Sequence, residues 1–148
     1  MALLAGEDPA DLARRLSAFA EGGPAEDGAA GKVMAQTRLD PVLIFTGMGP
    51  QWWAMGRELY EQEPLFKATL DRCDAIFKKH AGWSLLAQMF VADEAASSMA
   101  RTEIAQPANF FVQAGLLELW RALGVQPSAV IGHSAGEVAS AYAGGILD

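Results

Sequence analysis

Two hydrophobic runs of strand length stand out along the chain, Pro41–Phe45 (PVLIF) and Ser128–Ile131 (SAVI). Their hydrophobicity is continuous rather than alternating, which is typical of strands buried on both faces, as in a parallel sheet. We therefore expect both runs to be strands of a parallel sheet, and the weaker run Val33–Gln36 to be a third.

Stretches with a helical period surround these runs. Asp8 as an N-cap and Pro9 at the first helical position predict a first helix, which the pair Gly22-Gly23 ends. A second helix is expected over Gln51–Tyr60, and an Ala-rich helix after the second strand.

The two longest helices are predicted over Pro64–Lys79 and Pro107–Leu123. The apolar stripe of the first consists of Phe66, Leu70, Cys73 and Phe77. The apolar stripe of the second consists of Val112, Leu116, Leu119 and Leu123.

Alternating strands and helices predict an α/β fold. A sheet covered on both faces usually contains about five or six strands, and only two clear ones are predicted, so we expect the N-terminal part of a larger domain. Residues 22–32 (GGPAEDGAAGK) have no hydrophobic period and predict a flexible connector. The chain is thus expected to divide into a first unit of residues 1–40 and an α/β unit of residues 41–148.

The composition and charge of the chain argue against several classes of function. Eleven Lys and Arg against 18 Asp and Glu give a net charge of −7, which argues against a nucleic-acid partner. No apolar run is long enough to span a membrane. The single cysteine, Cys73, excludes an intrachain disulfide and a site of zinc-finger type, so we expect no metal centre. Without a signal peptide, a reducing, cytoplasmic compartment is the expectation.

Candidate chemistry lies in the stretch after the second strand. Gly132-His133-Ser134-Ala135-Gly136 matches G-x-S-x-G between a strand and a helix, the context of a nucleophile elbow. Gly132 and Gly136 would remove collisions around the sharp turn. The N–H of Ala135, at the start of the helix, could stabilise an oxyanion.

A structural alternative exists for the same serine. Ser134 and Glu137 have the spacing of a capping box, in which Ser134 caps the helix and Glu137 reaches back to its N–H. Ser134 could therefore be a nucleophile, a cap, or both.

Neither histidine suits the role of a base for Ser134. His133 is its neighbour in the turn, and adjacent side chains there leave on different sides, so a packing role is expected. His80 follows Lys78-Lys79 at a helix end, where a surface imidazole is expected. The base is therefore expected outside this chain.

A second loop, Thr46–Gln51 (TGMGPQ), follows the first strand. Gly47 and Gly49 flank Met48, which would let the backbone approach a ligand. Alone this loop is an ordinary Gly/Pro turn that ends at Gln51. Beside an elbow it becomes a candidate for the other half of an oxyanion hole, with Met48 acting through its N–H.

Three segments resemble the acyltransferase domain of type I polyketide synthases and the related malonyl-CoA:ACP transacylases. They are FTGMGPQWWAMGREL (Phe45–Leu59), AQPANFFVQAGLLELW (Ala105–Trp120) and GHSAGEVASAYAGG (Gly132–Gly145). The resemblance covers about residues 41–148 and implies an α/β-hydrolase-like parallel-sheet subdomain, present only in part. The preceding residues resemble the end of a linker from a ketosynthase to its acyltransferase.

The resemblance also implies a reaction. Ser134 would accept a malonyl or methylmalonyl group from acyl-CoA and pass it to the phosphopantetheine thiol of an acyl carrier protein, without a catalytic cofactor. Met48 and Ala135 would form the oxyanion hole, although the family often has Gln where this chain has Met48. Gln106 matches a glutamine that lines the family's site; alternatively it is only a polar residue before a helix.

The family's catalytic histidine and its carboxylate-binding arginine lie downstream of the matched segments, so we expect these residues alone to be inactive. The acyl-CoA selected cannot be derived from them. Two alternatives stay open: a serine esterase or thioesterase with the same elbow, and a non-catalytic piece in which Ser134 only caps a helix.

Overall fold

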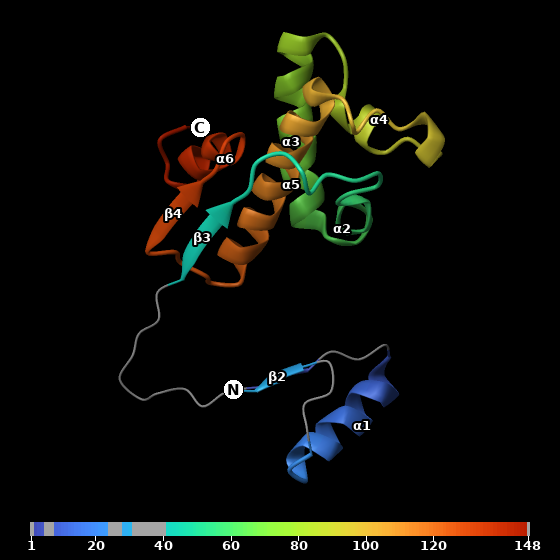
Figure 1. The fold of residues 1–148 in the computed structure, drawn as a ribbon, viewed down its shortest axis with the longest axis vertical. Coiled ribbons are helices and arrows are strands. Elements are labelled where there is room, and N and C mark those ends of the chain that lie inside the picture. The colour runs from blue at the N-terminus through green and yellow to red at the C-terminus, as the bar shows by residue number, and fades with distance from the viewer. Residues whose placement is uncertain (1, 5–7, 24–27, 31–40, 148) are drawn as a thin grey trace. The chain divides into compact units, whose positions relative to one another are not determined.

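The computed structural model describes residues 2–4, 8–23, 28–30 and 41–147 (Figure 1). The chain divides into two compact units, Met1–Leu39 and Asp40–Asp148. We call them the N-terminal and the C-terminal unit and describe each by itself.

The N-terminal unit contains β1 (Ala2–Leu4), α1 (Pro9–Ala20) and β2 (Gly28–Ala30). The predicted cap of α1 is confirmed, because a side-chain oxygen of Asp8 accepts a hydrogen bond from the N–H of Asp11 at 2.8 Å. β1 and β2 pair in antiparallel orientation, with Leu3 opposite Ala29.

The prediction of a connector without structure over residues 22–32 is wrong for Gly28–Ala30, which forms β2. Backbone pairing to β1 supplies order that a run of small residues does not encode by hydrophobic period. The expected strand Val33–Gln36 lies outside the described residues.

In the C-terminal unit, β3 (Val42–Phe45) and β4 (Ala129–Gly132) confirm the two predicted strands and their parallel pairing. The register runs from Val42 opposite Ala129 to Phe45 opposite Gly132. Both strands therefore end at the same edge of the sheet, which fixes where the following loops lie.

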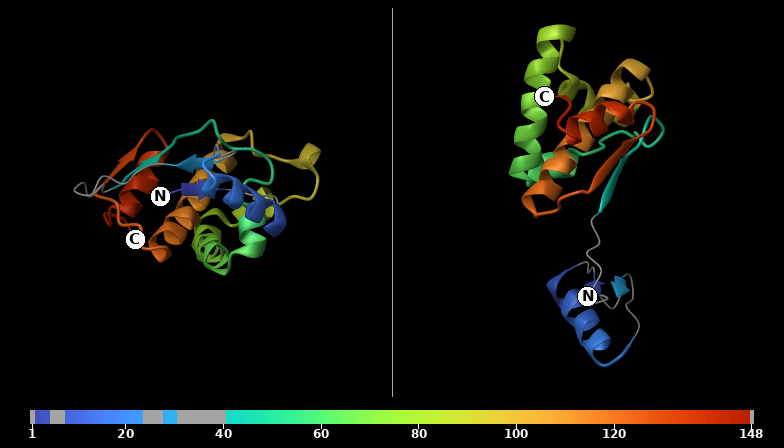
Figure 2. Two further views of the ribbon diagram at one scale, coloured as in Figure 1. Left: turned by 90° about the horizontal axis from the view of Figure 1, so that it is seen from below. Right: turned by 90° about the vertical axis from the view of Figure 1, so that its left-hand side faces the viewer.

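The expected burial of both strand faces is wrong. Ile44 is 70% exposed and Ile131 is 53% exposed, whereas Phe45, on the opposite face, is 6% exposed. The helices α5 (Thr102–Ala122) and α6 (Gly136–Ala143) lie on one side of the strand pair (Figure 2). Within the C-terminal unit, no described element covers the other face.

The remaining elements of this unit are α2 (Arg57–Gln62), α3 (Pro64–Ala81), α4 (Leu85–Met89) and a 3-10 turn (Glu94–Ala96). The prediction for α3 is confirmed to within two residues. The predicted helix Gln51–Tyr60 begins six residues late, because Ala54 and Gly56 have φ angles of 65° and 77°, which an α-helix does not accommodate.

α5 begins at Thr102, five residues before the predicted start, and includes Pro107 in its interior. Its predicted stripe is wrong at Leu123, which is 74% exposed, and at Leu116, which is 36% exposed, whereas Val112 and Leu119 pack against the core. The buried face is built largely from small residues: a Cβ atom at Gly115 would lie 2.5 Å from the Phe66 ring of α3. Close helix packing, rather than large side chains, decides which face is buried.

Candidate active site

Ser134 lies in the turn between β4 and α6 with a φ angle of 54°, a left-handed conformation that is unusual for a residue with a side chain. Its side chain is exposed. Strained backbone at a sharp strand-to-helix turn is the geometry of a nucleophile elbow.

The two glycines of G-x-S-x-G are required by close contacts. A Cβ atom at Gly136 would lie 2.2 Å from the carbonyl oxygen of Phe45, and one at Gly132 would lie 2.5 Å from the Cα of Glu137. Real Cβ atoms do not approach other atoms so closely, so only glycine permits this turn.

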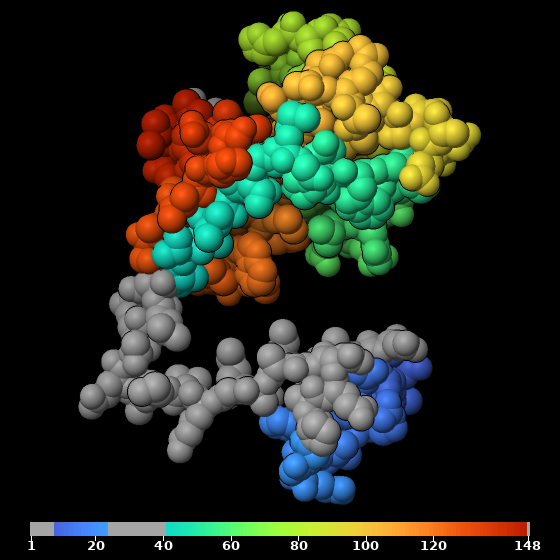
Figure 3. Space-filling view, viewed as in Figure 1, coloured from blue at the N-terminus to red at the C-terminus, as the bar shows by residue number. Residues whose placement is uncertain are grey.

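The loop after β3 lies against the loop after β4, in the cyan and orange-red segments of Figure 3. A Cβ atom at Gly47 would lie 2.9 Å from the Cβ of Ser134 and 3.0 Å from the carbonyl oxygen of His133. The N–H of His133 donates to the carbonyl oxygen of Phe45 at 3.0 Å, which continues the strand pairing into the loops.

The first loop is held by its own glutamine. The Oε1 of Gln51 accepts a hydrogen bond from the N–H of Gly49 at 2.7 Å. No hydrogen bond within the described residues uses the N–H of Met48 or of Ala135. Both groups therefore remain available to an acceptor outside the protein chain.

The expected capping box is absent. The N-cap of α6 is Ala135, and no side chain caps this helix. Ser134 contributes only its carbonyl oxygen, which accepts from the N–H of Glu137 at 3.0 Å. A capping serine needs an extended backbone, and Ser134 is left-handed instead. The interpretation of Ser134 as no more than a cap is therefore wrong.

Neither histidine forms a hydrogen bond with Ser134 in the described part of the chain. His133 is exposed, and its Nδ1 lies on the Gly47 side, 3.4 Å from where a Cβ of that glycine would be. His80 is exposed in the last turn of α3.

A cavity of about 520 Å³ opens beside the elbow, between α3, α5 and α6. Gln106 and Ala135 line it together, so the structure brings these two predicted residues to one site. Its other lining residues are mostly apolar: Arg72, Cys73, Ile76, Phe77, His80, Pro107, Phe110, Phe111, Val138 and Tyr142.

The α3 side of this cavity was not anticipated from the sequence. Cys73 and Phe77 were predicted as part of a buried stripe and His80 as a plain surface residue, yet all three line the cavity. Burial raises the pKa of the Cys73 thiol. A helical stripe indicates which residues share a face, but not whether a neighbouring element fills the space in front of them.

A glutamine of α5 reaches the first loop. The Nε2 of Gln113 donates to the carbonyl oxygen of Thr46 at 2.8 Å. Gln113 follows Gln106 by seven residues, about two helical turns, so both side chains leave the same side of α5. The seven-residue spacing from Gln106 was the sequence signal that could have identified Gln113 as a residue near the site.

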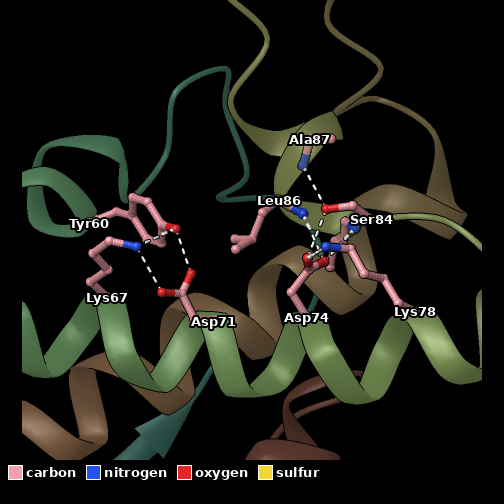
Figure 4. Close-up of polar contacts among 9 residues, drawn as sticks. Tyr60, Lys67, Asp71, Asp74, Lys78, Ser84, Leu86 and Ala87 are labelled. Carbon is pink, nitrogen blue, oxygen red and sulfur yellow. Dashed lines mark hydrogen bonds and ion pairs between the residues drawn. The ribbon is translucent and has the colours of Figure 1, made fainter.

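A buried carboxylate ties α3, which forms one wall of the cavity, to the start of α4 (Figure 4). Asp74 of α3 is 3% exposed and accepts hydrogen bonds from the N–H of Leu85 at 2.7 Å and the hydroxyl of Ser84 at 2.8 Å. Lys78 lies 2.8 Å from the same carboxylate. Burial alone would raise the pKa of Asp74, but these hydrogen bonds outweigh it and lower the pKa.

A second, exposed polar group lies one turn earlier on α3 (Figure 4). Asp71 accepts hydrogen bonds from Lys67 at 2.7 Å and from the hydroxyl of Tyr60 at 2.5 Å. The bond to Lys67 lowers the pKa of Asp71, and the same bond raises the pKa of Lys67. This group ties α2 to α3.

Across the described ranges, no three side chains of His, Cys, Asp or Glu are grouped as metal ligands would be. In the same residues, no helix combines the length and the apolar character that crossing a membrane requires.

Comparison with known proteins identifies the relatives of this chain. The acyl transferase domain family matches residues 42–148. Erythronolide synthase EryA2 of Saccharopolyspora erythraea is 39% identical over 146 residues, and Polyketide synthase GfsE of Streptomyces halstedii is 36% identical over 148. Each alignment covers 99% of this chain but 4% of the relative.

Solved structures of acyltransferases are also similar to this chain. The acyltransferase domain from the second module of the salinomycin polyketide synthase superposes with a TM-score of 0.82 at 34% identity, over 98% of this chain and 33% of that one. The malonyl-CoA:acyl carrier protein transacylase of Helicobacter pylori gives 0.61 at 27% identity, over 74% and 34%. The chain thus spans about a third of the solved domains, and the expected partial α/β fold is confirmed.

Proposed function

Because the chain belongs to the acyl transferase domain family, as part of a type I polyketide synthase acyltransferase domain, we propose that Ser134 is the nucleophile of acyl transfer. The observation that carries this is the φ angle of 54° at Ser134, in a turn that only its flanking glycines permit. A helix cap does not need that strain, whereas an exposed nucleophile does.

In the first half of the proposed reaction, Ser134 Oγ attacks the thioester carbonyl of an acyl-CoA. The carbon–sulfur bond breaks, coenzyme A leaves as its thiol with the proton from Oγ, and an acyl ester remains on Ser134. The N–H groups of Met48 and Ala135 would stabilise the oxyanion of the tetrahedral intermediate. Their freedom from protein acceptors within the described residues supports this role.

In the second half, the phosphopantetheine thiol of an acyl carrier protein attacks the ester. The ester bond to Oγ breaks, the new thioester forms, and Ser134 regains its proton. No electrons are gained or lost overall, so the proposed transfer needs no redox cofactor. Gln106 would contact the acyl group, and its position on the wall of the cavity that Ala135 also lines supports this role.

The base for Ser134 is proposed to come from the rest of the parent domain. This fits the absence of a hydrogen bond from Ser134 to His133 or His80 among the described residues, and the coverage of about a third of the solved domains. We further propose that the acyl group is of the malonyl or methylmalonyl type. The N-terminal unit would be the end of a linker from a ketosynthase.

The test uses the complete parent domain. Incubated with malonyl-CoA or methylmalonyl-CoA, the unmodified domain should gain one acyl group by intact-mass spectrometry, and Ser134→Ala should gain none. Ser140→Ala, a change in the same helix α6, is the matched control and should still acylate. Acylation of Ser134→Ala would overturn the proposal, and an ester consumed equally fast without carrier protein would favour an esterase.

A further inference from the structure

Gln113 connects α5 to the loop that carries the proposed Met48 donor. Its Nε2 lies 2.8 Å from the carbonyl oxygen of Thr46 and 3.4 Å from Thr46 Oγ1. Thr46 is the first residue after β3. The side chain therefore reaches across from the helix to the beginning of the loop.

Besides the hydrogen bond from Gln113, a close contact with Gly136 restricts the position of the Thr46 carbonyl. A Cβ atom at Gly136, the first residue of α6, would lie 2.6 Å from the Thr46 oxygen. The peptide unit that contains this carbonyl is planar, so fixing its oxygen also fixes the N–H of Gly47. Only the φ and ψ angles of Gly47 then separate this fixed unit from the N–H of Met48.

A second amide on the same helix face lacks a partner. Asn109 is 4% exposed, and its Nδ2 has no hydrogen-bond acceptor among the described residues. The Oε1 of Gln113 is likewise buried without a donor. Side chains four residues apart on a helix are neighbours, and an unpaired buried amide is costly. The structure shows no hydrogen bond between these two groups, so the contact that holds the Gln113 side chain is the one to Thr46.

We propose that Gln113 is a positioning residue for acyl transfer. Gln113 Nε2 holds the Thr46 carbonyl so that the Met48 N–H faces the reacting carbonyl oxygen. The inference rests on the proposed function, since it assigns Gln113 to the same oxyanion hole.

The experiment measures ester formation on Ser134 in the complete parent domain. Gln113→Leu removes the amide and keeps the size of the side chain. The rate at saturating acyl-CoA should fall about 10-fold or more, a fraction of the loss when an oxyanion donor is deleted. The KM and the thermal unfolding temperature should change little. Gln62→Leu, on the exposed face of α2, is the matched control and should behave as the unmodified domain.

A probe that forms a tetrahedral adduct with Ser134 distinguishes a positioning role of Gln113 from a role in the stability of the domain. Labelling of Ser134 by a fluorophosphonate places an oxygen in the oxyanion hole, so Gln113→Leu should slow this labelling about as much as it slows acylation.

Unchanged rates in Gln113→Leu, or a loss that appears in KM alone or only together with unfolding, would overturn the inference. Ser134→Ala distinguishes it from the proposed function. If Ser134→Ala still forms the ester, the proposed function fails. If Ser134→Ala is inactive while Gln113→Leu is normal, only the role of Gln113 fails.

Discussion

Gly47 and Ser134 meet across the ends of two paired strands, since a Cβ atom at Gly47 would lie 2.9 Å from the Cβ of Ser134. β3 and β4 run parallel with Phe45 opposite Gly132, so the residues that follow each strand reach the same edge. The glycine after β3 is thus part of the elbow after β4, although Gly47 and Ser134 are 87 positions apart in the sequence.

Replacing Gly47 by alanine is expected to disable the site more than it destabilises the fold. The added Cβ must push the Ser134 turn and the Met48 N–H apart, so ester formation on Ser134 should fall about 100-fold in the complete domain. The measurement is the rate of acyl-enzyme formation by mass spectrometry, with circular dichroism to verify folding.

The control for this change is Gly144→Ala. Gly144 has a φ angle of −79°, and the nearest atom to an added Cβ lies at 3.3 Å, so the rate should change less than about threefold. A normal rate in Gly47→Ala would contradict the contact between the two loops.

Gly115→Ala is expected to lower the stability of the C-terminal unit. The new Cβ would lie 2.5 Å from the Phe66 ring and 2.8 Å from Leu70, both fully buried, so α3 and α5 must separate. Overpacking of this kind costs about 1–3 kcal/mol of unfolding free energy. Urea unfolding of the complete domain measures it, and a stability equal to that of the unmodified domain would show that this packing is wrong.

Asp74 is expected to make stability depend on pH. The pKa of its carboxyl is lowered in the folded state, so its contribution is present above the unfolded pKa and is lost as the pH falls through the folded value. Asp74→Ala should cost about 2–3 kcal/mol at pH 7, because it leaves the N–H of Leu85 and the Ser84 hydroxyl without this acceptor. The deficit should shrink below about pH 4.

The matched control is Asp71→Ala, one turn away on the same helix and exposed. Loss of its ion pair with Lys67 should cost less than about 1 kcal/mol. Denaturant unfolding of both variants at pH 7 and at low pH is the measurement. Equal costs for the two aspartates would contradict the buried bracing role of Asp74.

The 148 residues by themselves are expected to transfer no acyl group at a steady rate. This expectation follows from the proposed function and from the observation that, among the described residues, no histidine is hydrogen-bonded to Ser134. The assay mixes the purified chain with malonyl-CoA and a carrier protein and follows the loaded carrier by mass spectrometry. Steady transfer would show that the proposed division of the site is wrong.

Much of the C-terminal unit could be predicted from short stretches of the sequence. The strands β3 and β4 follow from continuous apolar runs, α3 from its period, and the elbow from the position of Gly132 and Gly136 around Ser134. Each of these rests on interactions between residues near one another in the chain, such as steric limits on φ and the spacing of side chains on a helix.

Other features depended on neighbours that no local pattern reveals. The sequence spacing allowed Ser134 to be a helix cap, and only the folded backbone, left-handed at that residue, excluded it. The stripe of α5 was misjudged because small residues, packed against Phe66, form its buried face. Ile44 is exposed because α5 and α6 cover only the opposite face of the strand pair.

By itself, the sequence determined the strands β3 and β4, the helix α3, the elbow glycines and the family resemblance, because these depend on residue type and short spacing. Only the tertiary structure decided that Gly47 contacts Ser134, that Gln106 and Ala135 share a cavity with α3, and that Gln113 reaches Thr46. The physical reason is that the parallel register of β3 and β4 and the packing of α5 bring distant segments together, and both are set by contacts across the chain.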